Sequence, residues 1–124
     1  MKTENVIAEK SKAFALRIIR LFQYLRSEKN EYIMSKQLLR SGTSIGANVR
    51  EATRAQSKAD FNAKIAIALK EAEETAYWLE LLFESDYLGK RAYHSIYSDC
   101  NEICKLLMSI SKSAREEECA AHNV

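Results

Sequence analysis

Proline is absent from this chain of 124 residues, and glycine occurs only three times, at Gly42, Gly46 and Gly89. Both residue types interrupt helices, proline because it lacks a backbone N–H and glycine because it loses the most conformational freedom on folding. The remaining composition, with 47% hydrophobic and 29% charged residues, is usual for a soluble globular protein. The sequence therefore predicts an all-α chain, and its length fits a single domain with its own core.

Long apolar runs are also missing, since none approaches the ~20 residues that span a bilayer. The first residues, MKTENVIAEKSKAF, are polar with helical spacing, which predicts no signal peptide. Three cysteines, an odd number without dense spacing, argue against a secreted disulfide scaffold. Together these features predict a cytoplasmic protein that does not enter a membrane.

Histidine is scarce, with His94 and His122 as the two examples, and this excludes several kinds of site. A di-iron bundle needs Glu-x-x-His on two helices, and neither histidine follows a glutamate at that spacing. Cys100 and Cys104 lie four residues apart but lack further metal ligands, and Cys119 with His122 has no second pair. We therefore predict no metal, no cofactor and no enzymatic activity.

Charge is unevenly distributed, although the net charge is only +2. Residues 1–60 hold 12 Lys and Arg against six Asp and Glu, whereas residues 61–124 hold seven against eleven. A basic half favours an anionic partner such as nucleic acid. The alternative is that the two halves pair with each other inside the bundle or across subunits.

Apolar residues recur at spacings of three and four along four segments, which predicts four helices. The expected ranges are residues 3–29, 31–56, 58–85 and 90–115, and residues 116–124 are expected to fray because they carry no apolar stripe. Ser57 should cap the third helix by accepting a hydrogen bond from the amide of Asp60, and Gly89 should adopt the left-handed conformation. Short turns force neighbouring helices to be antiparallel, so residues 1–115 are predicted to form an antiparallel up-down-up-down four-helix bundle.

The stretch QLLRSGTSIGANVREA, residues 37–52, does not read as an ordinary core helix. Gly42 and Gly46 share one helix face, and each costs roughly 1 kcal/mol relative to alanine in a helix. Close approach of a neighbouring helix or another subunit would compensate for that cost. We therefore expect the two glycines to form a packing notch.

Polar residues form a second line along the same stretch: Gln37, Ser41, Ser44, Asn48 and Glu51. Buried polar groups need partners, because an unpaired one costs about 1–3 kcal/mol. Arg40 offers a forked donor, and Glu71 and Glu74 in the third helix are the expected acceptors. The line is either an internal network that fixes helix register, which we favour, or a binding surface.

This stretch resembles the signature of the small "four helix bundle protein" family, which includes proteins encoded in intervening sequences of bacterial large-subunit ribosomal RNA genes. The matching residues are Gln37, Leu38, Arg40, Ser41, Ser44, Ile45, Asn48, Glu51, Asp60, Phe61, Glu71, Glu74, Thr75, Tyr77, Trp78 and Leu79. The resemblance covers roughly residues 5–112, and it departs from the pattern at Arg50 and Ala52. It implies a four-helix bundle that often forms a ring-like homopentamer, and no enzymatic activity. It also implies kinship with accessory proteins of diversity-generating retroelements, which bind reverse transcriptase and nucleic acid.

Two functions remain in view for a non-enzymatic bundle of this kind. The first is binding of nucleic acid, with structured RNA favoured, through phosphate contacts from the basic half. The candidate residues are Lys10, Arg17, Arg20, Arg50, Arg54 and Lys58. The second is a homo-oligomeric scaffold that docks a partner protein and has no nucleic-acid affinity of its own. Trp78, next to the apolar seam of the third helix, is placed either in a subunit interface or in ordinary bundle packing.

Overall fold

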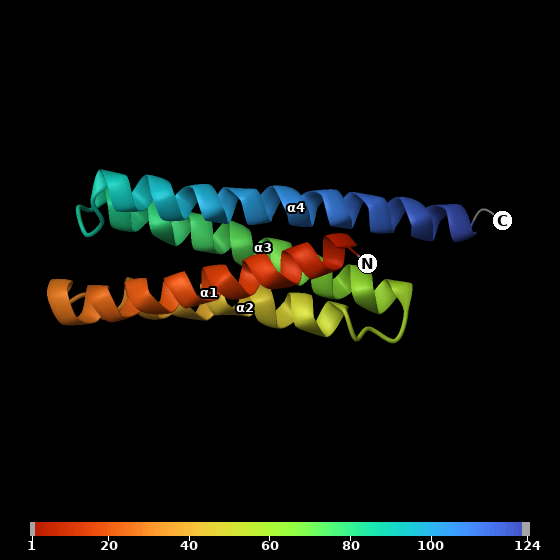
Figure 1. The fold of residues 1–124 in the computed structure, drawn as a ribbon, viewed down its shortest axis with the longest axis horizontal. Coiled ribbons are helices and arrows are strands. Elements are labelled where there is room, and N and C mark those ends of the chain that lie inside the picture. The colour runs from red at the N-terminus through yellow and green to blue at the C-terminus, as the bar shows by residue number, and fades with distance from the viewer. Residues whose placement is uncertain (1, 123–124) are drawn as a thin grey trace.

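The structure is a computed structural model that describes residues 2–122, with side chains described to residue 120. Within these residues it contains four helices, α1 (Lys2–Lys29), α2 (Met34–Ala52), α3 (Lys58–Glu84) and α4 (Lys90–His122). Each helix contacts the two that flank it around the bundle, and α4 closes the arrangement against α1 (Figure 1). The predicted all-α, antiparallel up-down-up-down four-helix bundle is confirmed.

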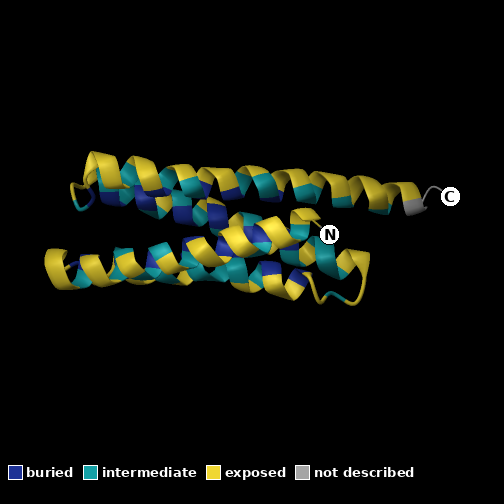
Figure 2. Cartoon of the chain, viewed as in Figure 1, coloured by how far each residue is buried: buried dark blue, intermediate teal, exposed yellow. Residues whose placement is uncertain are grey.

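The core follows the helical periodicity of the sequence. Figure 2 shows the buried residues of each helix on the side that faces the other helices, and the exposed residues on the outer side. The largest fully buried side chains include Phe14, Ile18, Leu38, Leu79 and Leu107. Burying a side chain of this size stabilises the fold by roughly 1.5–3 kcal/mol. Among residues 2–122, no helix carries an apolar stretch that could cross a bilayer.

The turn between α1 and α2 is built around Glu31. The preceding residue, Asn30, has a φ of 53°, and the Glu31 carboxylate accepts hydrogen bonds from the N–H of Ile33 (3.1 Å), Met34 (3.1 Å) and Ser35 (2.7 Å). Glu31 therefore caps α2 from outside, and the helix begins at Met34 rather than near Glu31 as predicted. Burial alone would raise the pKa of Glu31, but these backbone donors and the Ser35 hydroxyl outweigh it and lower the pKa.

The predicted end of α2 is also too late, since the helix ends at Ala52 rather than Gln56. Residues 53–57 are needed to reverse the chain, and the last turn tightens into bonds between residues three apart, such as Ala55 N–H to the Ala52 carbonyl at 3.1 Å. The predicted cap of α3 is confirmed: the Ser57 hydroxyl accepts from the Asp60 N–H at 3.0 Å.

The loop between α3 and α4 corrects the prediction for Gly89. The left-handed residue is Asp86, with a φ of 68°, and Gly89 does not have a positive φ. Aspartate tolerates this region because its short polar side chain bonds locally. Gly89 instead directly precedes α4, and its carbonyl accepts the N–H of Tyr93 at 2.9 Å as the first hydrogen bond of that helix.

α4 continues to His122, past the boundary predicted at Arg115, and Figure 1 shows it running beyond the end of the other helices. No proline or glycine follows Gly89, so nothing in the sequence interrupts the helix. Its far end is held to α3 by a hydrogen bond from the Asn62 amide to the Glu118 carboxylate. Residues 123–124 of the tail that was expected to fray lie outside the described residues.

Candidate functional site

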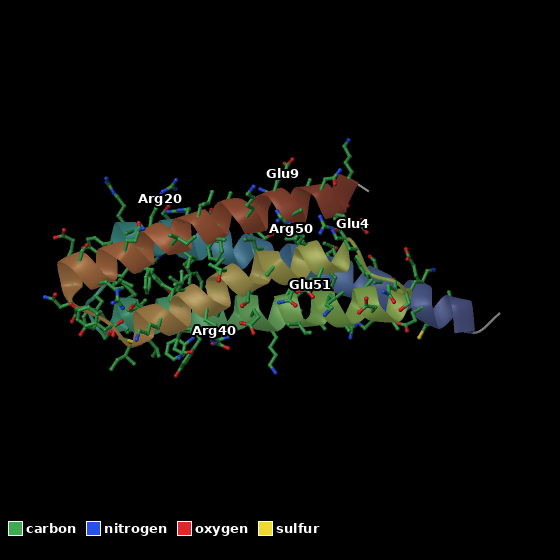
Figure 3. The ribbon with its side chains drawn as sticks, turned by 90° about the horizontal axis from the view of Figure 1, so that it is seen from below. Glu4, Glu9, Arg20, Arg40, Arg50 and Glu51 are labelled. Carbon is green, nitrogen blue, oxygen red and sulfur yellow. The ribbon has the colours of Figure 1, made fainter. Side chains whose placement is uncertain are left out.

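Arg40 joins α2 to α3 on the outside of the bundle (Figure 3). Its guanidinium pairs with Glu71 at 3.2 Å and with Glu74, and its Nε donates to the Gln37 side chain at 3.3 Å. The Trp78 indole N–H donates to the same Glu74 carboxylate at 3.0 Å. The structure thus brings together Gln37, Arg40, Glu71 and Glu74 from the sequence-predicted set. Trp78 was not assigned to this cluster, although its position four residues after Glu74 places it on the same helix face.

Deeper in the same interface, Ser41 meets Thr75. The Thr75 hydroxyl lies 2.9 Å from the Ser41 hydroxyl and 2.8 Å from the Glu71 carbonyl, and both residues are fully buried. The Ser41 hydroxyl also lies 3.4 Å from the Leu38 carbonyl. This pair is inaccessible to a ligand, so it serves the packing of α2 on α3.

The remaining polar residues of the line do not join this cluster. Ser44 donates to the Arg40 carbonyl at 2.6 Å, and Asn48 donates to the Ser44 carbonyl at 2.8 Å, so both are satisfied within their own helix. Glu51 pairs with Lys64 of α3 at 3.2 Å. The five residues of the line therefore make separate contacts, either within α2 or with α3, and they do not form a single surface.

Gly42 and Gly46 both face α1. A Cβ built on Gly42 would lie 2.8 Å from Cγ1 and from Cγ2 of Ile18, which is too close for any real contact. A Cβ on Gly46 would lie 3.5 Å from the backbone and hydroxyl of Ser11, an ordinary van der Waals distance. A methyl group is therefore excluded at Gly42 by the Ile18 side chain, whereas Gly46 has room for one.

The basic candidates on α1 point toward α4, away from α2. Lys10 pairs with Glu102 at 3.1 Å, and Arg17 pairs with Asp99 at 2.6 Å. Both ion pairs are solvent-exposed and so contribute little stability, but they neutralise two of the six predicted phosphate contacts. Arg20 lines the same side of the bundle and forms no ion pair within the described residues. Figure 3 shows Arg20 and Arg50 on opposite sides of α1.

A second cationic site lies in the groove between α1 and α2. The groove has a volume of about 460 Å³, and its floor consists mostly of small residues: Ala8, Ala15, Thr43, Gly46 and Ala47. Lys12, Arg50 and Arg54 line it and form no ion pair among the described residues. Arg50 lies at the seam between the two helices (Figure 3). The one acid that lines this groove, Glu51, is already paired with Lys64. Lys12 was not among the sequence candidates, because its proximity to Arg50 depends on the packing of two helices.

Lys58, the sixth candidate, lines a cavity of about 580 Å³ at the end of the bundle where α4 projects. Its other lining residues come from the start of α1, the 52–57 segment, the first turns of α3 and the last third of α4. They are Thr3, Glu4, Ala52, Thr53, Ala55, Gln56, Ser57, Phe61, Asn62, Ser109, Ile110, Ser113, Ala114 and Glu117. The six predicted phosphate contacts therefore occupy three sites, of which only the groove and this cavity meet, at the short segment between α2 and α3.

Cys100, Cys104 and Tyr97 of α4 have shifted pKa values. Cys100 is buried, its thiol lies 3.4 Å from the Ala72 carbonyl, and its hydrogen bond to Cys104 together with burial raises its pKa. The same hydrogen bond lowers the pKa of Cys104. Burial and a 3.0 Å hydrogen bond to Glu80 raise the pKa of Tyr97 to about 12. Among the described residues, no three His, Cys, Asp or Glu side chains gather closely enough to hold a metal ion.

Comparison with known proteins identifies a family and a solved structure of high sequence identity. The family model described as 23S rRNA-intervening sequence protein matches residues 3–109. A protein of unknown function from Bacteroides thetaiotaomicron, described as belonging to the S23 ribosomal protein family, has a crystal structure. Its sequence is 57% identical to this chain. The match has a TM-score of 0.87 and covers 89% of this chain and 98% of that chain. No curated protein matches.

Proposed function

Because this chain belongs to the 23S rRNA-intervening sequence protein family, we propose that it is a non-enzymatic bundle that binds nucleic acid, with structured RNA as the favoured partner. The contact surface is the groove between α1 and α2. The protein acts in the cytoplasm as a homo-oligomer, and the pentamer implied by the family resemblance is the favoured assembly.

The observation that carries this proposal is that three cations along one groove, Lys12, Arg50 and Arg54, form no ion pair with any residue that the structure describes. Lysine and arginine that already pair with acids, such as Lys10 and Arg17, must break those pairs before they bind a phosphate. The groove cations carry no such cost. The small residues between them allow a backbone to approach closely, as required for phosphate contacts that fix position without reading sequence.

Salt dependence of RNA binding tests the proposal. For a double helix, the logarithm of affinity falls with the logarithm of salt concentration by about 0.9 for each phosphate contact. Replacing Lys12, Arg50 and Arg54 together with alanine should therefore reduce this slope by nearly 3 per protomer. The matched control replaces Lys10 and Arg17, which are exposed but already paired, and should leave the slope within about 1 of the native value. Absent or salt-insensitive binding of both RNA and DNA contradicts the proposal.

A second function is favoured by a separate observation, the exposed apolar residues Ile33, in the turn before α2, and Tyr77, on α3. Ile33 is 78% exposed and Tyr77 is 54% exposed, and Tyr77 packs edge-on against Trp78 with ring centroids 5.5 Å apart. Large exposed apolar side chains mark protein interfaces more often than nucleic-acid contacts. In this alternative the protein is an oligomeric scaffold for a partner protein. Replacing Ile33 and Tyr77 together with serine would then abolish capture of that partner. Neither the native protein nor this variant would bind RNA.

The oligomeric state is measured separately, by native mass spectrometry of the purified chain across a concentration series. A pentamer agrees with the expectation from the family resemblance. A monomer at all concentrations contradicts that part of the proposal and leaves the groove contacts to be tested on the single chain.

A further inference from the structure

The cavity that Lys58 lines, at the end of the bundle where α4 projects, has features that phosphate contacts in the groove do not use. Its walls carry Glu4 and Glu117 as well as Lys58. The two carboxylates would repel a phosphate group inside the cavity. Its floor includes the half-buried Phe61 ring and Ile110. A neutral, flat and partly apolar group suits this combination better than a free anion.

Asn62 adds a requirement for a hydrogen-bond donor. Its side-chain nitrogen donates to Glu118, but its Oδ1 is shielded from solvent and has no partner. Unsatisfied buried acceptors are rare in folded proteins because each loses its bonds to water without a replacement. The terminal torsion of asparagine is soft, so Oδ1 can turn toward the cavity that the residue lines. A ligand with an N–H group would satisfy it.

The cavity also adjoins the cationic groove. Arg54 lines the groove, while Thr53 and Ala55 on either side of it line the cavity. A strand whose phosphates lie on Arg50 and Arg54 would therefore pass the mouth of the cavity, where Lys58 provides a further cation.

From this arrangement we propose that the cavity holds one unpaired nucleobase with an exocyclic amino group, stacked on Phe61. The Asn62 amide turns on binding, so that its nitrogen leaves Glu118 and its Oδ1 accepts from the base, while the phosphates of the strand stay outside on Arg54 and Lys58. This rests on the proposed function, which it makes more specific. The partner is then an RNA with a bulge, loop or single-stranded end rather than a continuous duplex, since only an unpaired base can leave its stack.

The first test compares two RNA hairpins that differ at one position, a bulged adenosine in one and an abasic ribose in the other. Stacking of one base on an aromatic side chain changes affinity by about five-fold or more. The native protein should therefore bind the adenosine hairpin at least about five-fold more tightly. Asn62→Leu and Phe61→Ala should lose this preference while keeping the affinity for the abasic hairpin. Asn101→Leu, an exposed asparagine on α4, is the matched control and should keep the preference.

Three outcomes of this comparison overturn the base pocket. They are equal affinity of the native protein for both hairpins, an unchanged preference in Asn62→Leu, and loss of the preference in the Asn101→Leu control. If binding to both hairpins remains steeply salt-dependent, the proposed function survives without the pocket.

The second test removes the RNA strand and uses NMR of the full-length protein with adenosine 5′-monophosphate or ribose 5-phosphate. The pocket predicts that the nucleotide shifts the Asn62 side-chain amide signals in a saturable way and that ribose 5-phosphate does not. Such shifts in a protein that binds no hairpin would support the pocket and refute the proposed function. The pocket is overturned if the nucleotide causes no shift or if both ligands cause an equal shift. It is also overturned if, with spermidine added as a third ligand, only this polyamine causes a saturable shift.

Discussion

The two glycines of α2 allow a paired experiment, because they are one helical turn apart and have different surroundings. Replacing either with alanine should gain about 1 kcal/mol of helix stability, since alanine loses less conformational freedom than glycine. At Gly46 the new methyl group would make an ordinary contact, 3.5 Å from Ser11. Gly46→Ala should therefore be neutral or raise the free energy of unfolding by up to about 1 kcal/mol.

At Gly42 the same change meets Ile18 at 2.8 Å from both Cγ1 and Cγ2 and at 3.2 Å from Cβ. These atoms are close to the backbone, and the χ1 angle of isoleucine is nearly fixed in a helix, so the side chain cannot turn aside. Either α1 moves or the contact remains strained, and overpacking of this kind costs about 1–3 kcal/mol. After the gain in propensity, Gly42→Ala should be neutral to about 2 kcal/mol less stable than the native protein.

Urea unfolding at one fixed protein concentration measures both variants, so that any oligomer contributes equally. The double variant Gly42→Ala with Ile18→Ala identifies the cause. Ile18→Ala alone should cost about 2–5 kcal/mol, and less in the Gly42→Ala background because the added methyl group fills part of the space left by Ile18. A Gly42→Ala variant that is more stable than Gly46→Ala, or additive effects of Gly42→Ala and Ile18→Ala, would refute this description of the notch.

Three further predictions concern stability and reactivity. Glu31→Ala should lower the free energy of unfolding by about 1 kcal/mol at neutral pH, as the loss of a helix cap does. The pKa of Glu31 is lower in the folded state, so its contribution to the free energy of unfolding is present above its ordinary pKa and disappears as the pH falls through the folded value. The exposed control Glu28→Ala should have little effect on stability at any pH. Thr75→Val should cost about 1–3 kcal/mol in chemical denaturation because it leaves the buried Ser41 hydroxyl poorly paired, and adding Ser41→Ala should restore most of that loss. A thiol reagent should modify the exposed Cys119 quickly in the native protein, the half-buried Cys104 more slowly, and the buried Cys100 only in denaturant; fast modification of Cys100 in the native state would contradict its burial.

The bundle itself could be predicted from the sequence because it depends on local periodicity. Residues such as Phe14, Ile65 and Leu107 recur at helical spacing, and no breaker interrupts the segments. The turns were predicted less well, because two of their key residues act in less usual ways. Glu31 caps α2 with its side chain from outside the helix, and Asp86 takes the left-handed conformation that was assigned to the nearby glycine.

The candidate sites were harder to predict because they depend on contacts between residues distant in sequence. Nothing around Lys10 or Arg17 indicates that Glu102 and Asp99 lie opposite them, so both looked available for phosphate. Lys12 appears beside Arg50 only after α1 packs on α2. Similarly, the polar line of α2 could be read as a surface or as a network until its partners on α3 were located. The cavity that Lys58 lines is formed by four separate segments of the chain, so no local sequence pattern predicts it.

The measurement that tests the central claim most directly is the salt dependence of RNA binding by the native protein beside the variant with Lys12, Arg50 and Arg54 replaced by alanine. The groove predicts affinity that falls steeply with salt in the native protein, and a slope smaller by nearly 3 per protomer in the variant. The control with Lys10 and Arg17 replaced should stay close to native. The same slope in the native protein and the groove variant, or a loss in the control alone, would contradict the assignment of nucleic-acid binding to the groove between α1 and α2.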